Sequence, residues 1–258
     1  MNDRESRYEF GRTRWSLVLG AGRHDGDAAA AARNELLVRY HEAVYRYLLA
    51  RLNDPHAAGE LYSRFAERVL ELHPFLERAD PGKGRFRDYL RTVLRRMVLD
   101  YHRENQRANR RRRDILPGGN AEPVAPPDEP ADDEATFRGI WVEELMGLAW
   151  KALAEAEAAG GQPYHSVLLY KARNPAARSE AVAEHFARVT GRPFTAAGVR
   201  QLLHRGQERL ADLLVREVAR GCADGAGGAS ADRVGEELIA LGLLDGPRRD
   251  ALERYRRG

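Results

Sequence analysis

Apolar side chains recur at helical spacing over residues 27–113 and again over residues 135–220. In the first stretch the pattern predicts three helices, over residues 27–51, over residues 55–71 and from residue 86 onward. Asp54 followed by Pro55 is typical of a helix start. The third helix has the clearest apolar stripe, which steps by three and four residues: Phe86, Tyr89, Leu90, Val93, Leu94, Met97, Val98 and Tyr101.

The second stretch predicts four more helices: over residues 135–159, after Pro163, over residues 179–189, and a long one capped by Thr195. No convincing alternation of polar and apolar residues occurs, so we predict an all-α protein. A short helical tail is expected after a glycine-rich stretch, with its apolar side formed by Val234, Leu238, Leu241 and Leu244. This tail either packs back on the second domain or binds a regulator.

The two helical stretches are separated by residues 114–134, which contain five prolines and seven acidic residues and no basic residue. Such a segment buries too little apolar surface to offset its ordering entropy, so we interpret it as a flexible linker. The expected organisation is two small helical domains. It comprises an N-terminal extension (1–26), a first domain (27–113), the linker (114–134), a second domain (135–220), and a glycine-rich hinge with a tail (221–258).

The sequence carries little that favours catalysis or a cofactor. Cys222 is the only cysteine, which excludes an intrachain disulfide and a four-cysteine zinc site. The eight histidines form no metal-binding motif, and no nucleophile elbow or phosphate-binding loop is complete. The apolar stretch Trp15–Leu19 is too short for a signal peptide or a membrane span. We therefore expect a cytoplasmic protein that is not an enzyme, with no metal, no cofactor and no membrane contact.

Charge is segregated along the chain rather than large in total. The net charge is +3 and the pI about 9.1, and nearly all of the positive charge is arginine. An arginine excess also follows from a GC-rich coding sequence. The polar side of the third helix nonetheless forms a basic ridge, which suits binding to phosphates: Arg85, Arg87, Arg91, Arg95, Arg96, His102, Arg103 and Arg107. Tyr89 and Tyr101 either stack on unpaired bases or belong to the core.

Residues 179–209 have the layout of a helix-turn-helix, with two helical patterns joined by a short break that contains glycine. In that layout the start of the second helix enters the major groove. Arginine and glutamine make bidentate contacts with base edges there. The predicted contacts are Thr195, Arg200, Gln201, His204 and Arg205. An ordinary helical hairpin remains the alternative.

Together these segments resemble the sigma-70 family of RNA polymerase factors in its short extracytoplasmic-function (ECF) form. The third helix resembles the family's helix for the −10 promoter element, with Phe86-Arg87-x-Tyr89-Leu90 at its start and Asp100-x-x-Arg103 at its end. The preceding segment AAGELYSRFAERVLE resembles the helix that binds the polymerase clamp. Leu203-His204-Arg205 followed by Leu210 resembles the end of the −35 recognition helix.

The resemblance implies core RNA polymerase and promoter DNA as partners, and leaves open an anti-sigma protein or another regulator. It assigns polymerase binding to Glu60, Leu61, Arg64 and Phe65, and −10 contacts to Arg87, Arg91, Arg95, Arg96 and Arg103. The chain departs from the family where Arg96 replaces the usual Asn and where the clamp helix lacks its Gln. The main alternative is a helix-turn-helix regulator that does not engage polymerase. A helical interaction protein is a second alternative.

Overall fold

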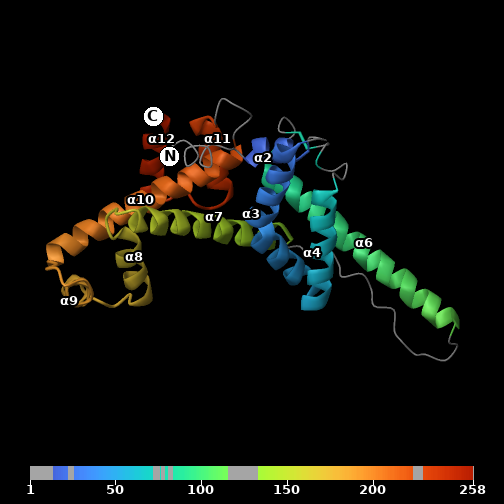
Figure 1. Cartoon of the computed structure of the whole chain (residues 1–258), viewed down its shortest axis with the longest axis horizontal. Helices are drawn as coiled ribbons and strands as arrows, with labels where there is room; N and C mark the ends of the chain where they lie inside the picture. The colour runs from blue at the N-terminus through green and yellow to red at the C-terminus, as the bar shows by residue number, and fades with distance from the viewer. Residues whose placement is uncertain are drawn as a thin grey trace. The chain divides into compact units, whose positions relative to one another are not determined.

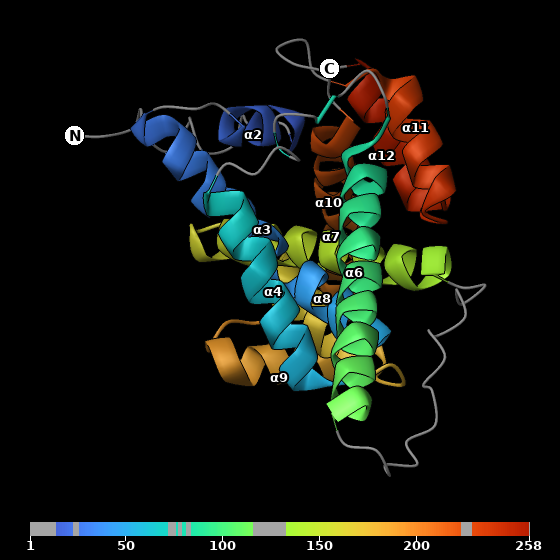
Figure 2. The ribbon, with the colours of Figure 1, turned by 90° about the vertical axis from the view of Figure 1, so that its right-hand side faces the viewer.

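The computed structural model describes residues 14–22, 26–71, 76, 79–80, 84–115, 133–222 and 229–257, in which helices dominate and no strand occurs (Figures 1 and 2). The all-α prediction is confirmed. The helices are α2 (Arg14–Ala21), α3 (Asp27–Leu52), α4 (Pro55–Leu70), α6 (Phe86–Ile115), α7 (Asp133–Ala158), α8 (Tyr164–Arg173), α9 (Ser179–Thr190), α10 (Ala196–Cys222), α11 (Ala231–Ala240) and α12 (Gly246–Arg257).

Local sequence sets the junction between α3 and α4. Asn53 ends α3 in the left-handed region, at φ 49°, which Asn tolerates better than most residues. The Asp54 carboxylate then accepts hydrogen bonds from the backbone N–H groups of His56 and Ala57, at 2.8 and 3.3 Å. Pro55 occupies the first turn, where its missing N–H leaves no bond unmade. The predicted helix start is confirmed.

The described residues form two compact units, one ending at Val142 and the other beginning at Glu143. In the first unit, α3 and α4 pack on each other and on α6 and bury Leu36, Tyr40 and Phe65. Helix α2 also joins this unit, because Leu17 and Val18 are buried and α2 contacts α3. The sequence pattern predicted no helix there, since the segment is only two turns long.

The first ten residues of α7 belong to the first unit. Trp141 stacks on Tyr40, with ring centroids 5.6 Å apart, and Phe137 packs edge-on against Tyr47 at 5.3 Å. Asp133 accepts a hydrogen bond from the Tyr47 hydroxyl at 2.7 Å and lies 3.3 Å from Arg51 Nε. The sequence pattern assigned residues 114–134 to the linker. Of these, residues 114–115 end α6 and residues 133–134 begin α7, while residues 116–132 lie outside the described part.

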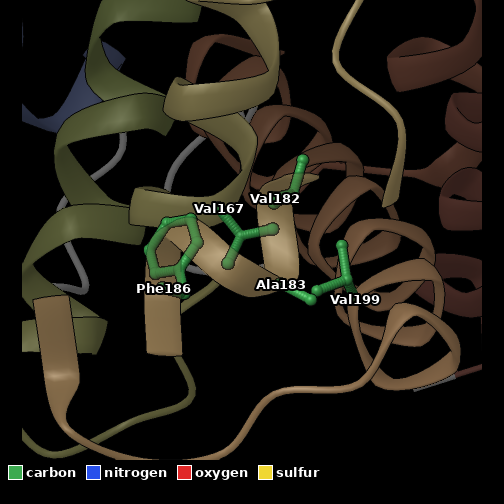
Figure 3. Close-up of a cluster of buried hydrophobic side chains, with 5 residues drawn as sticks. All are labelled: Val167, Val182, Ala183, Phe186 and Val199. Carbon is green, nitrogen blue, oxygen red and sulfur yellow. The ribbon is translucent and has the colours of Figure 1, made fainter. Parts of the chain in front are cut away.

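Helix α10 organises the second unit. Its first half packs with α8 and α9 around a small core of Val167, Val182, Ala183, Phe186 and Val199 (Figure 3). Its second half carries α11 and α12, which also contact each other (Figures 1 and 2). Val218, Val234 and Leu238 are buried there. The tail thus forms two helices where the sequence pattern predicted one, and it packs on α10.

Candidate nucleic-acid interface

Helix α6 separates its apolar and basic residues onto different sides, as its sequence predicts. Leu90, Leu94 and Met97 are buried in the core of the first unit. Arg95, Arg96 and Arg103 are exposed on the other side, and the exposed row continues through Arg107 and Arg110. Core packing therefore fixes which way α6 faces, and the arginines remain accessible to an anionic partner.

Arg103 of this row and the partly buried Arg91 have acidic neighbours within the first unit. Arg103 Nη1 lies 3.3 Å from Asp100 Oδ1, an exposed pair three residues apart. Arg91 Nη1 lies 3.3 Å from Glu134 Oε2, and the Arg91 side chain is 27% exposed. Surface pairs of this kind contribute only about 0–1 kcal/mol, so either arginine can exchange its acid for a phosphate at small cost.

Arg87 does not lie on the exposed ridge. Its side chain is only 9% exposed, and its Nε atom lies 3.7 Å from Asp88 Oδ1. Sequence spacing alone placed it with the other arginines, but the first turn of α6 is where the helix enters the core beside Phe86. The prediction that Arg87 contacts the −10 element does not fit this burial.

Tyr101 and His102 occupy the border between the core and the basic side of α6, and both are half-buried. The Arg64 guanidinium lies over the Tyr101 ring, 6.0 Å from its centroid. Partial burial, followed by the nearby Arg51 cation, lowers the pKa of His102, so this histidine is neutral near pH 7. Tyr89 is also half-buried, so the choice between base stacking and a core role stays open for both tyrosines.

Two of the four residues assigned to polymerase binding are core residues. Leu61 and Phe65 are 2% and 1% exposed, because the inner stripe of α4 packs on α3. A direct contact with a partner protein does not fit either residue. Glu60 and Arg64 lie on the accessible side, where Arg64 bridges Glu60 and Glu104 at 2.8 Å each. These two hydrogen-bonded carboxylates raise the pKa of the Arg64 guanidinium, led by Glu104.

The turn between α9 and α10 is fixed at both ends. Gly191 ends α9 in the left-handed region, at φ 68°, where a side chain would be strained. The Thr195 hydroxyl accepts a hydrogen bond from Gly198 N at 3.0 Å and so caps α10 as predicted. Phe186 and Phe194 pack across the turn, with ring centroids 5.8 Å apart. The start of α10 is therefore held rigidly.

All five residues predicted to read the −35 duplex are exposed: Thr195, Arg200, Gln201, His204 and Arg205. They gather at the start of α10 because the other side of this helix packs on the core through Val199. Beside them lies an open hollow of about 320 Å³, lined in part by Thr195, Gln201 and Arg205. His204 has an acid in reach, with Nε2 lying 3.7 Å from Glu208 Oε1. The surface thus offers donors and acceptors suited to base edges.

Two other kinds of feature are absent from the part of the chain that the structure describes. No three His, Cys, Asp or Glu side chains gather closely enough there to hold a metal ion. None of the helices described has both the length and the apolar composition needed to cross a bilayer.

Comparison with known families bears on the first unit. Residues 36–108, which run from within α3 through α4 and most of α6, match the family model described as sigma-70 region 2. No curated protein and no solved structure matches the chain. The matched residues make up 73 of the 258 residues of the chain.

Proposed function

We propose that this protein is an ECF-type sigma factor that binds core RNA polymerase and directs it to promoters through separate −10 and −35 contacts. The observation that carries the proposal is the set of exposed arginines on α6, of which Arg95, Arg96, Arg103 and Arg107 lie within the residues that match sigma-70 region 2. Such a factor acts in the cytoplasm, where bacterial RNA polymerase works. We assign the −10 contacts to the first unit, which ends at Val142, and the −35 contacts to the second unit, which begins at Glu143.

The −10 contacts are Arg91, Arg95, Arg96 and Arg103. These guanidinium groups hold the phosphates of a strand that must be separated from its partner for transcription to begin. Tyr101 lies at the border of this face, about one turn before Glu104. Stacking of an unpaired base on such a ring stabilises the captured strand by about 1–3 kcal/mol.

The −35 contacts come from the α9–α10 pair acting as a helix-turn-helix. Arg200 and Gln201 are exposed in the first turns of α10, the part of a recognition helix that reaches base edges. His204 and Arg205 extend the same face by one turn. The Thr195 cap supports the proposal, because it holds the start of α10, and with it this face, in a fixed direction.

Polymerase binding is proposed for the accessible side of α4, around Glu60 and Arg64. The chain keeps one acid of the family's usual clamp-helix pattern here, and its Leu61 and Phe65 act indirectly by holding α4 on α3. The accessible pair Glu60 and Arg64 is therefore the place where a substitution should weaken polymerase binding without disturbing the core.

The test is co-purification of the tagged full-length chain with bacterial core RNA polymerase, without DNA, at low and moderate salt. We expect stoichiometric retention, which a Glu60→Ala/Arg64→Ala variant weakens. A matched control is Arg173→Ala, an exposed arginine at the end of α8. Loss of polymerase by the parent chain, with DNA binding intact, would instead favour a helix-turn-helix regulator that acts without polymerase.

A further inference from the structure

The second half of α10 carries a row of charged residues that continues beyond the proposed base-reading face. Arg205, Arg209, Asp212 and Arg216 are spaced by four, three and four residues, so they share one side of the helix. Neither Arg209 nor Arg216 has an ion-pair partner among the described residues. Asp212 is the acid that interrupts this row, and Glu208 on the same side of the helix lies 3.7 Å from His204 Nε2.

The tail neutralises that acid. Arg254 of α12 approaches Asp212 Oδ1 with both Nε and Nη2, at 2.9 and 2.8 Å. Next to this pair lies an open hollow of about 730 Å³, lined in part by Arg216, Arg254 and Arg256. Arg256 is itself paired with Asp232 and Glu253. Helix α12 as a whole has five arginines and two acids, so the tail adds positive charge beside α10.

We propose that Arg209 and Arg216, which continue the line of the base-reading Arg205, form a second DNA contact. The Arg254–Asp212 pair removes the negative charge between them, and the two arginines bind backbone phosphates that flank the −35 element. The inference rests on the proposed function, because it assumes that the start of α10 lies in the major groove. The tail thereby becomes part of the DNA-binding surface.

The length of α10 favours phosphates over bases for this row. With a rise of 1.5 Å per residue, Arg216 lies about 16 Å along the helix axis from Arg205. The major groove is about 12 Å wide, so a helix whose start lies in the groove carries Arg216 out to the flanking backbone. Guanidinium groups without acidic partners suit phosphate oxygens at that position.

The test measures binding of the full-length chain to a labelled DNA duplex over a series of salt concentrations, by fluorescence anisotropy. Arg216→Ala should weaken binding to all sequences alike and reduce the slope of log K against log salt by about one. Asp212→Asn should strengthen binding, because it frees Arg254 and removes the acid from the row. Arg249→Ala, an exposed arginine of α12 outside the hollow, should change neither quantity.

The outcomes separate this inference from the proposed function. If the parent chain retains polymerase but Arg216→Ala leaves the slope of log K against log salt unchanged, the phosphate row is wrong and the sigma assignment stands. A reduced slope without polymerase retention overturns the sigma assignment alone. An Asp212→Asn variant that binds DNA no more tightly than the parent shows a purely structural ion pair and overturns the inference. Thermal protection by millimolar inorganic phosphate that Arg216→Ala abolishes, with no change in DNA binding, assigns the hollow to a free anion and also overturns it.

Discussion

Arg200 is exposed in the second turn of α10 and has no acidic partner among the described residues. In the first unit, by contrast, Tyr47 is fully buried, and its hydroxyl donates a hydrogen bond to Asp133. One side chain is available for a partner, and the other holds α7 to α3. Predictions for these two residues therefore concern different measurements, DNA selectivity and stability.

Replacing Arg200 with Ala should reduce discrimination among promoter sequences by about 1–3 kcal/mol, because a bidentate contact to a base edge is lost. Competition binding between the preferred −35 duplex and single-base variants measures this loss. Equal weakening on every sequence would show that Arg200 contacts phosphates instead of bases.

Replacing Tyr47 with Phe should lower the free energy of unfolding by about 1–2 kcal/mol, because the hydrogen bond to Asp133 is lost. Burial first, and then Asp133, raise the pKa of Tyr47 above its ordinary value. The stabilisation that Tyr47 provides is therefore complete below about pH 10. It falls as the pH rises further, because the Tyr47 hydroxyl ionises in the unfolded state before it ionises in the folded state. Urea unfolding at pH 8 and pH 11 measures both effects. If Tyr47→Phe loses as much unfolding free energy between these two pH values as the parent chain does, the pH dependence does not come from Tyr47.

At the scale of elements, α7 differs most from what its sequence pattern suggested. Trp141 and Phe137 are buried in the first unit, whereas Leu145, Ala149 and Leu153 are buried in the second. A periodic apolar stripe shows that a helix has a buried side but not which core it joins. The pattern therefore predicted that this segment is a helix, but not that its two halves belong to different cores.

Replacing Trp141 with Ala should destabilise the first unit by about 3–5 kcal/mol, because a large buried ring leaves a cavity beside Tyr40. Trp150→Ala is the matched control, since Trp150 is half-buried on the same helix and packs edge-on against His165. Thermal unfolding of both variants makes the comparison. Equal losses would argue that Trp141 contributes no more than a partly exposed ring.

Helical periodicity also explains which other features were predictable. The amphipathic helices α3, α4 and α6 follow directly from spacing, and the Thr195 cap follows from its residue type just before a periodic stretch. The exposure of Arg200 and Gln201 follows from the same periodicity. Burial of Arg87 and the packing of α2 were not predictable, because both depend on which segments meet in three dimensions.

At the scale of the whole molecule, the tail is part of the second unit. Helices α11 and α12 cover the second half of α10 and bury Val234, Leu238 and Leu252. The Tyr255 hydroxyl also donates to the Ala229 carbonyl at 3.0 Å, which ties the end of the tail to its beginning.

Deleting residues 231–258 should lower the thermal unfolding temperature of the chain, because the apolar surface of α10 around Val215 and Val218 becomes exposed. Calorimetry of the full-length and shortened chains measures the change. An unchanged unfolding temperature would show that the tail contributes nothing to the stability of α10.

Helix α7 also has a consequence for how this protein can change during evolution. Exchange of domains between proteins normally takes place at exposed linkers, where few contacts are cut. A crossover between Val142 and Glu143 would divide one continuous helix and leave each half with unpaired backbone groups. A crossover before Asp133, the first residue of α7, keeps this helix whole, so a transplanted second unit brings Phe137 and Trp141 with it. Any new first unit must then offer a pocket for these two aromatic rings.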